Sequence, residues 1–257
     1  MPPQLVLSLF PGIDILGMGF EECGFTIVRG PDVLWGGDIR TFSVPAGRFD
    51  GVLGGPPCQA FSRLSYMVRQ NGYEPKFGNL IPEFERVCFE AQPQWFLMEN
   101  VREAPIPAVA GYEVFSCLLN NRQLGEAQNR VRRWSFGTRD GAVLMIDTVA
   151  LESIEFEYAA VGGSQERFPI KLNSDGTKKS TLRAHQSRLP FNSKSASAFR
   201  ELCRKQGLPE DFDLPGFTVA GKCKAVGNAV PMAMARALAK AVREYVESMA
   251  INTGIGA

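Results

Sequence analysis

The feature that most constrains this 257-residue chain is a series of short apolar runs that alternate with helical segments. Four runs have the length and composition of buried strands, namely residues 5–10, 25–28, 51–54 and 95–98. Helices are expected over residues 15–23, with an end at Gly24, and over residues 80–91. Strands that alternate with helices form a parallel sheet through right-handed crossovers. The sequence therefore predicts an α/β fold built on a doubly wound, Rossmann-like sheet.

Polar residues follow these runs, at the positions where a doubly wound sheet binds its ligands. Pro11-Gly12, Asp38, Cys58 and Glu99 each come just beyond the expected end of a strand. Because the carboxyl ends of parallel strands lie at one edge of the sheet, we expect these residues to lie close together.

Cys58 stands in the tetrapeptide Pro56-Pro57-Cys58-Gln59, directly after Gly54-Gly55. The two prolines fix φ before the cysteine, and the two glycines permit unusual backbone angles before the prolines. A thiol held this rigidly at a strand end is placed for nucleophilic attack. The alternative is that Cys58 is one more small buried hydrophobe, as most cysteines outside disulfides are. The tetrapeptide alone leaves both interpretations open.

Three further motifs place polar groups in an apolar context. Residues 96–101 form an apolar run that ends in Glu99 and Asn100. Residues 128–132 alternate polar and apolar positions, so on one strand the side chains of Gln128, Arg130 and Arg132 would share a face. Gly227-Asn228-Ala229-Val230-Pro231 is expected to open the last helix, because proline is favoured in a first turn. The apolar stripe of that helix comprises Ala235, Leu238, Val242, Tyr245 and Met249.

Taken in order, the motifs PCQ, ENV, QxRxR and GN-x-VP resemble those of the C5-cytosine-specific DNA methyltransferase family. The resemblance covers nearly the whole chain, apart from roughly residues 138–195. It implies a Rossmann-like methyltransferase sheet and transfer of a methyl group from S-adenosylmethionine to a cytosine flipped out of double-stranded DNA. The loop that runs from Cys58 to about Leu80 would close over the flipped base. Its alternative is an ordinary surface loop.

The resemblance assigns chemistry to four residues. Cys58 would add to C6 of cytosine as a covalent nucleophile. Glu99 would hold a proton at N3, and Arg130 and Arg132 would contact O2, the sugar-phosphate or Glu99 itself. For both arginines the alternative is a structural ion pair with a carboxylate. On the substrate side we also place Gln59, Ser62, Asn100 and Gln128, with Asn100 expected to shape the loop rather than react.

The methyl donor is expected to bind beside the first strand. Phe10, Pro11 and Gly12 match part of the family motif F-x-G-x-G-G, but Asp14 and Ile15 replace its later glycines, and Ser8 replaces an expected acid. Asp14 is therefore expected to face the ammonium group of the donor. The remaining donor-binding candidates are Asp32 for the ribose, Asp38 and Ile39 for the adenine, and Pro56, Asn228 and Val230 around the pocket.

The segment 138–195 is expected to form a small inserted target-recognition domain, which separates catalytic segments 1–137 and 196–257. Strands are expected at residues 142–146 and 154–161. Ten basic residues lie between positions 167 and 205, opposed only by Asp175 and Glu201. This excess favours contacts with DNA phosphates over the alternative of a merely solvated surface. Lys178 and Lys179 are expected to meet phosphate, and base edges are expected to be read by Arg183, His185, Gln186 and Arg188.

Composition narrows the other possibilities. The six cysteines are scattered, without a CxxC or Cys/His cluster, so we expect reduced thiols and no metal site. No signal peptide and no apolar run of about 18 residues is visible, so we expect a cytoplasmic monomer that spans no membrane. The alternatives are an RNA cytosine C5-methyltransferase, although its usual Cys-Phe-Thr signature is absent, and an inactive nucleic-acid-binding relative. The intact set of Cys58, Glu99 and Arg132 argues against inactivity. A thiol hydrolase would need a histidine base, and the chain has only His185.

Overall fold

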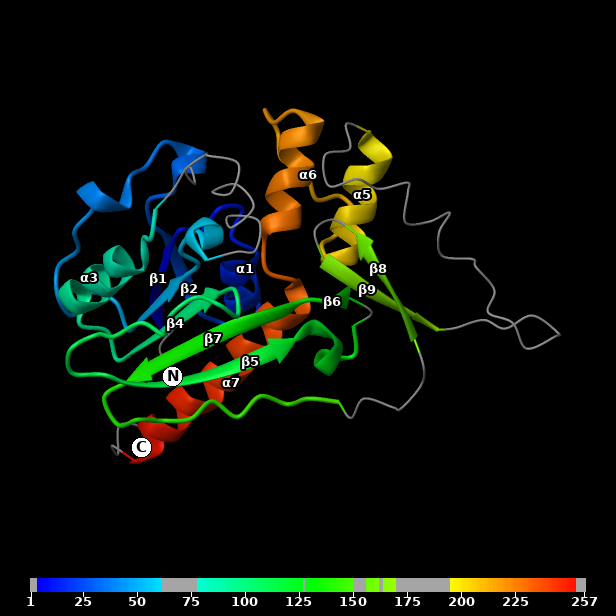
Figure 1. Ribbon diagram of the computed structural model, residues 1–257. Coiled ribbons are helices and arrows are strands. Elements are labelled where there is room, and N and C mark those ends of the chain that lie inside the picture. The colour runs from blue at the N-terminus through cyan, green and yellow to red at the C-terminus, as the bar shows by residue number, and fades with distance from the viewer. Residues whose placement is uncertain are drawn as a thin grey trace. The chain divides into compact units, whose positions relative to one another are not determined.

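A computed structural model describes residues 4–61, 78–126, 128–149, 156–161, 164–169 and 195–252 (Figure 1). The chain divides into two compact units. The first comprises Met1–Leu119, Val131–Ile146 and Ala235–Ala257. The second comprises Asn120–Arg130 and Asp147–Met234.

A six-stranded sheet with the order β2-β1-β3-β4-β7-β5 forms the centre of the first unit. Its strands are β1 (Leu5–Leu9), β2 (Thr26–Arg29), β3 (Gly51–Gly54), β4 (Trp95–Asn100), β5 (Glu113–Asn120) and β7 (Val131–Thr138). Neighbouring strands from β2 to β4 are parallel, whereas β7 is antiparallel to β4 and runs opposite to β5 (Figure 1). The four predicted strands are therefore confirmed, and the sheet is mixed rather than wholly parallel.

Helix α3 (Ile81–Ala91) covers one face of this sheet. The helix begins where it was expected, and Phe84, Val87 and Cys88 join an apolar core with residues of β1, β3 and β4. Gly54 of β3 lies directly under the ring of Phe84, and a β-carbon at this position would collide with that ring. The glycine therefore permits the helix to pack closely at the end of the strand.

Helices α1 (Ile15–Glu22) and α7 (Met232–Asn252) cover the other face of the sheet. Phe20 of α1 stacks on Trp95 of β4 with ring centroids 6.0 Å apart, and Tyr245 of α7 meets the ring of Phe136 edge-on. An ideal β-carbon on Gly19 would lie 2.6 Å from the β-carbon of Ala235, so only glycine allows α1 and α7 to approach this closely. The expected helix 15–23 and the expected start of the last helix near Pro231 are both confirmed.

The second unit contains a three-stranded antiparallel sheet and two helices. The sheet has the order β6-β9-β8, with β6 (Gln128–Asn129), β8 (Phe156–Val161) and β9 (Ser164–Pro169). Helices α5 (Ala196–Lys205) and α6 (Val219–Asn228) pack on each other, and each buries a cysteine, Cys203 and Cys223. A short 3-10 helix, η4 (Asn121–Leu124), belongs to the same unit.

These units divide the chain differently from the expected domains. The second unit combines Asn120–Arg130 with Asp147–Met234, whereas the expected recognition domain covers residues 138–195. Long-range hydrogen bonds explain its extent. The side-chain amide of Gln206, at the end of α5, donates to the carbonyl of Val226 in α6, and the guanidinium of Arg130 donates to the carbonyl of Gly227. Residues 120–130 and 196–234 are thereby joined in one unit. The role of the expected recognition domain stays a prediction.

Three local expectations were wrong. Residues 142–146 form no strand, although Leu144 is buried. Residues 128–132 are not one strand, because the chain leaves the ladder at Arg130 between β6 and β7. Gly227 and Asn228 end α6 instead of opening a helix, and Ala229 is extended, with φ −72° and ψ 163°. The motif therefore joins two helices.

In the described ranges, no helix is both long and apolar enough to cross a membrane. In the same ranges, no three or more side chains of His, Cys, Asp or Glu gather in a way that would hold a metal ion.

Candidate active site

The candidate site lies at the carboxyl edge of the parallel strands β1, β3 and β4. Leu9 pairs with Gly54, and Gly54 pairs with Met98, so the three strands reach this edge together. The backbone nitrogen of Gly55 donates to the carbonyl of Leu9 across 3.3 Å, which joins the chain beyond β3 to the end of β1. Glu99 is the second-last residue of β4, whereas it was expected just beyond the end of this strand. The ends of β1, β3 and β4 therefore lie together at this edge.

Cys58 begins a short 3-10 helix, η3 (Cys58–Ala60), and Pro57 precedes it with φ −50°. The buried side chain of Asn100 donates through Nδ2 to the carbonyl of Pro56 across 3.1 Å. Its Oδ1 accepts from the backbone nitrogen of Val101 at 2.9 Å. The last residue of β4 therefore pins the loop that presents the thiol, which agrees with the expectation that Asn100 shapes this loop.

The five other cysteines of the chain each have a raised pKa. Burial raises the pKa of Cys23, Cys117 and Cys223, and raises that of Cys203 to about 11. The pKa of the fully buried Cys88 lies well above its ordinary value for the same reason. These five thiols are protonated at neutral pH. The partly buried Cys58 is the thiol that the fold places at the carboxyl edge of the sheet.

Glu99 and Arg132 form an ion pair beside this loop. Arg132 Nε lies 2.8 Å from Glu99 Oε1, and the two side chains are only 19% and 16% exposed. Arg132 Nη1 also donates to the carbonyl of Val131 at 2.8 Å, which orients the guanidinium. A β-carbon on Gly55 would lie 3.6 Å from Glu99 Oε2, so the carboxylate lies against the chain that leads to Cys58. Of the contacts expected for Arg132, the one with Glu99 is therefore present.

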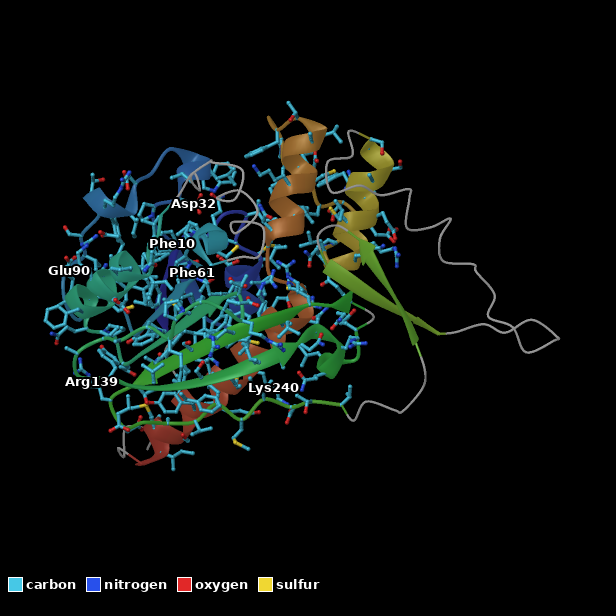
Figure 2. The ribbon with its side chains drawn as sticks, in the orientation of Figure 1. Phe10, Asp32, Phe61, Glu90, Arg139 and Lys240 are labelled. Carbon is cyan, nitrogen blue, oxygen red and sulfur yellow. The ribbon has the colours of Figure 1, made fainter. Side chains whose placement is uncertain are left out.

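The loop after β1 is tied to the segment that follows β2. The backbone nitrogen of Gly12 donates to Asp32 Oδ2 across 2.9 Å, and the indole nitrogen of Trp35 donates to the Gly12 carbonyl across 2.7 Å. Figure 2 shows Asp32 and Phe10, which are thus held in neighbouring loops. Gly12 has φ +56°, which glycine tolerates best, and no atom of the described residues, its chain neighbours aside, lies within 4 Å of a β-carbon built there. As far as the described residues go, open space therefore lies over the backbone of Gly12.

Phe10 and Asp14 bracket this loop in unusual conformations, with φ 53° and 56°. Residues other than glycine rarely adopt the left-handed region, and such strain clusters at ligand sites. Phe10 and Phe61, labelled in Figure 2, also pack against the same apolar core. The loop after β1 and the end of η3 therefore share one support.

Asp14 was expected to face the ammonium group of the donor, but its side chain is buried. Its side chain is 3% exposed and accepts hydrogen bonds from the Ser8 hydroxyl at 2.8 Å and from the backbone nitrogen of Gly17 at 3.1 Å, where it caps α1. Arg29 Nε lies 2.8 Å from its other oxygen. Burial raises the pKa of Asp14 to about 6, against the lowering effects of Ser8 and Arg29. The carboxylate is turned inward because these three partners hold it there.

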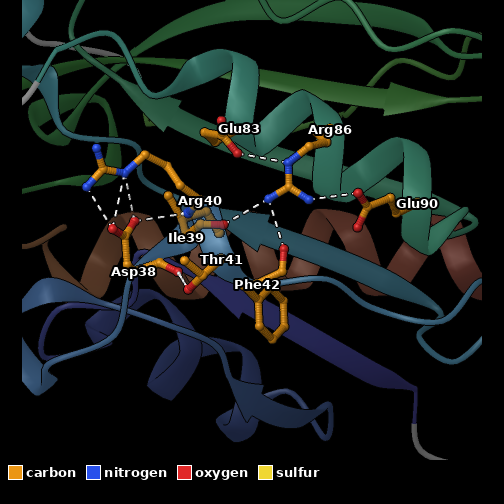
Figure 3. Close-up of polar contacts among 8 residues, drawn as sticks. All are labelled: Asp38, Ile39, Arg40, Thr41, Phe42, Glu83, Arg86 and Glu90. Carbon is orange, nitrogen blue, oxygen red and sulfur yellow. Dashed lines mark hydrogen bonds and ion pairs between the residues drawn. The ribbon is translucent and has the colours of Figure 1, made fainter.

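Asp38 and Ile39 lie at the start of another 3-10 helix, η2 (Ile39–Thr41) (Figure 3). Asp38 is partly exposed and pairs with Arg40, whose Nη2 lies 2.7 Å from Asp38 Oδ2. Hydrogen bonds from the side chain and backbone of Arg40 lower the pKa of Asp38 to about 2. Ile39 is buried in the core beneath α3. The carboxylate of Asp38 is therefore partly exposed, and the buried side chain of Ile39 holds the turn that carries it.

Arg130, in the second unit, binds three backbone carbonyls. Its Nη1 donates to the carbonyl of Gly227 at 3.2 Å, and its Nη2 donates to the carbonyls of Asn228 and Ala229, both at 3.0 Å. The guanidinium therefore caps the carboxyl end of α6, where unpaired carbonyls and the helix dipole favour a cation. Arg130 holds the backbone that carries Asn228 and leads to Val230.

The match with a known family falls on the centre of this site. The family described as C-5 cytosine-specific DNA methylase matches residues 35–105, a range that includes Asp38, Cys58 and Glu99. The chain is 28% identical to the Type II methyltransferase M1.HphI of Haemophilus parahaemolyticus, over 92% of this chain and 86% of that protein. This chain belongs to the C5-cytosine-specific DNA methyltransferase family. The family and the enzyme class expected from the sequence are confirmed.

A second relative matches part of this methyltransferase more strongly. The Type II methyltransferase M.FnuDI of Fusobacterium nucleatum is 34% identical over 163 residues, which make up 52% of this chain and 46% of the relative. Among solved structures, the Entamoeba histolytica methyltransferase EhMeth has a TM-score of 0.58 at 11% identity and covers 96% of this chain and 99% of its own. That likeness confirms the expected Rossmann-like methyltransferase fold.

Several expected site residues lie outside the described residues. These are Ser62 and most of the loop after Cys58, together with Lys178, Lys179, Arg183, His185, Gln186 and Arg188. Gln59 is described, as a partly buried residue of η3. Gln128 is buried in β6, where it pairs with Glu166 of β9. The substrate roles of these residues stay predictions.

Two residues that hold the backbone next to expected site residues were not anticipated. Gln206 donates through Nε2 to the carbonyl of Val226 at 2.9 Å, beside the loop that carries Asn228, and no sequence signal marks it. Arg86 binds Glu83 and Glu90 on its own helix as well as the backbone of η2. The spacing of these three charges along α3 is the signal that would have singled out Arg86.

Proposed function

We propose that this family member methylates C5 of cytosine in DNA, with S-adenosylmethionine as the methyl donor and a covalent bond between Cys58 and C6. The observation that carries the proposal is the arrangement around Pro56. Asn100 pins the loop that presents the thiol, and the Glu99–Arg132 ion pair lies against the same loop. A thiol, a carboxylic acid and a guanidinium are the groups that this reaction needs at one place.

In the proposed reaction, the thiolate of Cys58 adds to C6, and the displaced electron pair makes C5 nucleophilic. C5 then takes the methyl group as the bond from that group to the donor's sulfonium sulfur breaks, which would leave a neutral thioether. The C5 proton leaves to a base, and the bond between the Cys58 sulfur and C6 breaks to restore the thiolate. The hydrogen bond from Asn100 keeps the sulfur in one position while its bond to C6 forms and later breaks, which lowers the entropic part of the barrier.

Glu99 and Arg132 act on the ring in this proposal. Glu99, when protonated, donates to N3 and offsets the negative charge that develops after the thiolate adds. Arg132 holds the Glu99 carboxyl group at 2.8 Å and has further N–H groups for O2 of the base. Both side chains are largely buried, so these interactions take place with little water and are stronger than at an exposed site.

Residues of the first unit fit the methyl donor. The open space over Gly12, the indole of Trp35, which is 59% exposed, and the outward carboxylate of Asp38 would hold a nucleoside and its polar groups. The two carboxylate oxygens of Asp32 accept hydrogen bonds from the backbone nitrogens of Gly12 and Leu34. We propose that Asp32 shapes this space, in addition to any contact with the ribose. Bound here, S-adenosylmethionine supplies an electrophilic methyl group. The family resemblance adds Asn228 and Val230 as further candidate contacts of the donor.

DNA recognition is assigned to the basic segment between residues 167 and 205. Lys178 and Lys179 would bind phosphate, so replacing both with alanine should weaken binding similarly on all sequences and flatten its salt dependence. Changes at Arg183, His185, Gln186 and Arg188 should alter which cytosines are methylated. A methylation profile that is unchanged after all four are replaced would place target choice elsewhere.

The deciding experiment is bisulfite sequencing of DNA treated with the purified protein and S-adenosylmethionine, with RNA offered in parallel. Conversion-resistant cytosines in DNA, lost in Cys58→Ala, are expected. Methylation of RNA alone would redirect the proposal to the RNA-modifying alternative. Methylation of neither substrate would support the inactive relative.

A further inference from the structure

Arg86 uses every nitrogen of its guanidinium group within the first unit (Figure 3). Its Nε donates to Glu83 Oε2 at 2.8 Å, and its Nη1 donates to Glu90 Oε1 at 2.7 Å. Its Nη2 donates to two backbone carbonyls, those of Ile39 at 2.8 Å and Phe42 at 2.9 Å. The two glutamates, on the same helix, hold the guanidinium in one plane, and that plane is aimed at η2.

The two carbonyls lie at the two ends of η2, so the contact holds the whole turn. Ile39 is its first residue and Phe42 its C-cap. The same turn fixes Asp38, because Thr41 Oγ1 donates to the Asp38 carbonyl at 3.0 Å. A rotation of η2 about its buried side chain would therefore redirect the Asp38 carboxylate, and Arg86 opposes that rotation.

The apolar contacts of η2 do not supply this orientation. Ile39 packs into the core with Phe84, Val87 and Cys88 of α3, which keeps the turn attached to the helix. Apolar packing is non-directional, whereas two hydrogen bonds from one planar group define an angle. Loss of Arg86 should therefore leave η2 attached and allow it to turn.

We propose that Arg86 is a positioning residue for the methyl donor, which sets donor affinity by orienting η2 and thereby Asp38 and Ile39. The inference rests on the proposed function, since it takes the donor to be S-adenosylmethionine bound at Asp38. No part of it requires Arg86 to touch the donor, because its nitrogen atoms are engaged by Glu83, Glu90 and the carbonyls of η2.

The test is calorimetric titration of the whole protein with S-adenosylmethionine, combined with steady-state methylation kinetics. Arg86→Ala should raise the Kd and the KM for the donor about tenfold, while kcat at saturating donor and the KM for DNA change by no more than about twofold. Arg86→Lys should also weaken donor binding, because one ammonium group cannot span two carboxylates and two carbonyls. Glu90→Gln, a milder change that removes one support of the guanidinium, should give a smaller rise in the same direction.

Arg243 supplies the matched control. From α7 it donates through Nε and Nη2 to the carbonyl of Cys23 at 3.1 and 2.6 Å, and it lies over the ring of Phe25. This contact also joins an arginine to a backbone carbonyl, but it lies where α1 leads into β2, at the edge of the sheet opposite the site. Arg243→Ala should lower the melting temperature and leave the donor Kd unchanged.

A double-mutant cycle with Asp38 completes the test. If Arg86 acts through Asp38, adding Arg86→Ala to Asp38→Ala should weaken donor binding by much less than tenfold. If the fold-increases in donor Kd of the two single variants multiply in full in the double variant, Arg86 does not act through Asp38, and the inference is overturned. Wild-type donor affinity in Arg86→Ala with a lowered melting temperature would also overturn it. Absence of donor binding in the wild-type protein would instead refute the proposed donor.

Discussion

Ser8 donates its hydroxyl to the carboxylate of Asp14 across 2.8 Å, and both side chains are buried. These are two of the positions at which the chain departs from the glycine-rich motif of its family. The carboxylate that the motif expects at position 8 is thus supplied from position 14, where a glycine was expected. The same carboxylate caps α1 at Gly17. The two departures compensate each other in space.

The buried Asp14 predicts a pH dependence of stability. Its pKa rises from 3.8 to about 6 on folding because burial disfavours the charged form. A raised carboxyl pKa contributes stability that is fully present below the unfolded value and is lost as pH rises through the folded value. The contribution at stake is about 3 kcal/mol. Urea unfolding of wild type and Asp14→Asn from pH 4 to 7 should show the wild type losing stability relative to the variant. A constant difference across this range would contradict the assignment.

Replacing the nucleophile should separate binding from turnover. Cys58→Ser should bind DNA and donor about as well as wild type, while methylation falls by orders of magnitude, because a hydroxyl at neutral pH is a poor nucleophile. Wild type should form a covalent adduct with DNA that contains 5-fluorocytosine, visible as a shifted band under denaturing conditions. An adduct formed by Cys58→Ala would show that another residue attacks.

The ion pair between Glu99 and Arg132 should matter for kcat. Glu99→Gln removes the acid that would protonate N3 and gives Arg132 a neutral amide as its partner, so we expect kcat to fall about 10²- to 10⁴-fold. The exposed pair of Glu22 and Arg236 is a suitable control, because Glu22→Gln breaks a surface ion pair of small energetic value. Single-turnover methylation with both variants tests this. Equal rates for the two variants would remove Glu99 from the mechanism.

Asn100 should act on the reaction through the loop it pins. Asn100→Ala leaves the carbonyl of Pro56 and the backbone nitrogen of Val101 without this partner, at a cost of about 1–3 kcal/mol of unfolding free energy. We also expect slower adduct formation with 5-fluorocytosine DNA and an unchanged donor Kd. The stability loss is read from chemical denaturation. Adduct formation at the wild-type rate would make Asn100 purely structural.

Arg130 should affect stability and donor binding together. Arg130→Ala uncaps the carboxyl end of α6, where it serves three carbonyls, and should cost about 1–3 kcal/mol. Because the same bonds hold the backbone of Asn228, the donor Kd should rise as well. Gln206→Ala, which loses the contact with Val226, is the companion variant and should show a smaller effect on both. Donor binding at full strength in Arg130→Ala would separate Asn228 from the pocket.

The local pattern of the chain determined the elements of the parallel half of the sheet. The strands that begin at Leu5, Gly51 and Trp95 and the helix that ends at Ala91 were predictable, because length, apolar content and turn residues are encoded within a few positions. The carboxyl edge was predictable for the same reason, since parallel strands bring their ends together whatever their side chains. The location of Cys58 and Glu99 at the carboxyl edge was therefore predictable as well.

Only the tertiary structure decided how the remaining polar side chains are used. The break at Arg130, the inward turn of Asp14 and the contact of Arg86 with η2 each depend on partners far along the chain, such as Gly227, Arg29 and Ile39. Sequence spacing describes neighbours within one helix or strand. It carries no record of which carbonyl or carboxylate another element will bring within hydrogen-bonding distance. That choice is made when packing satisfies buried polar groups, which is a property of the whole fold.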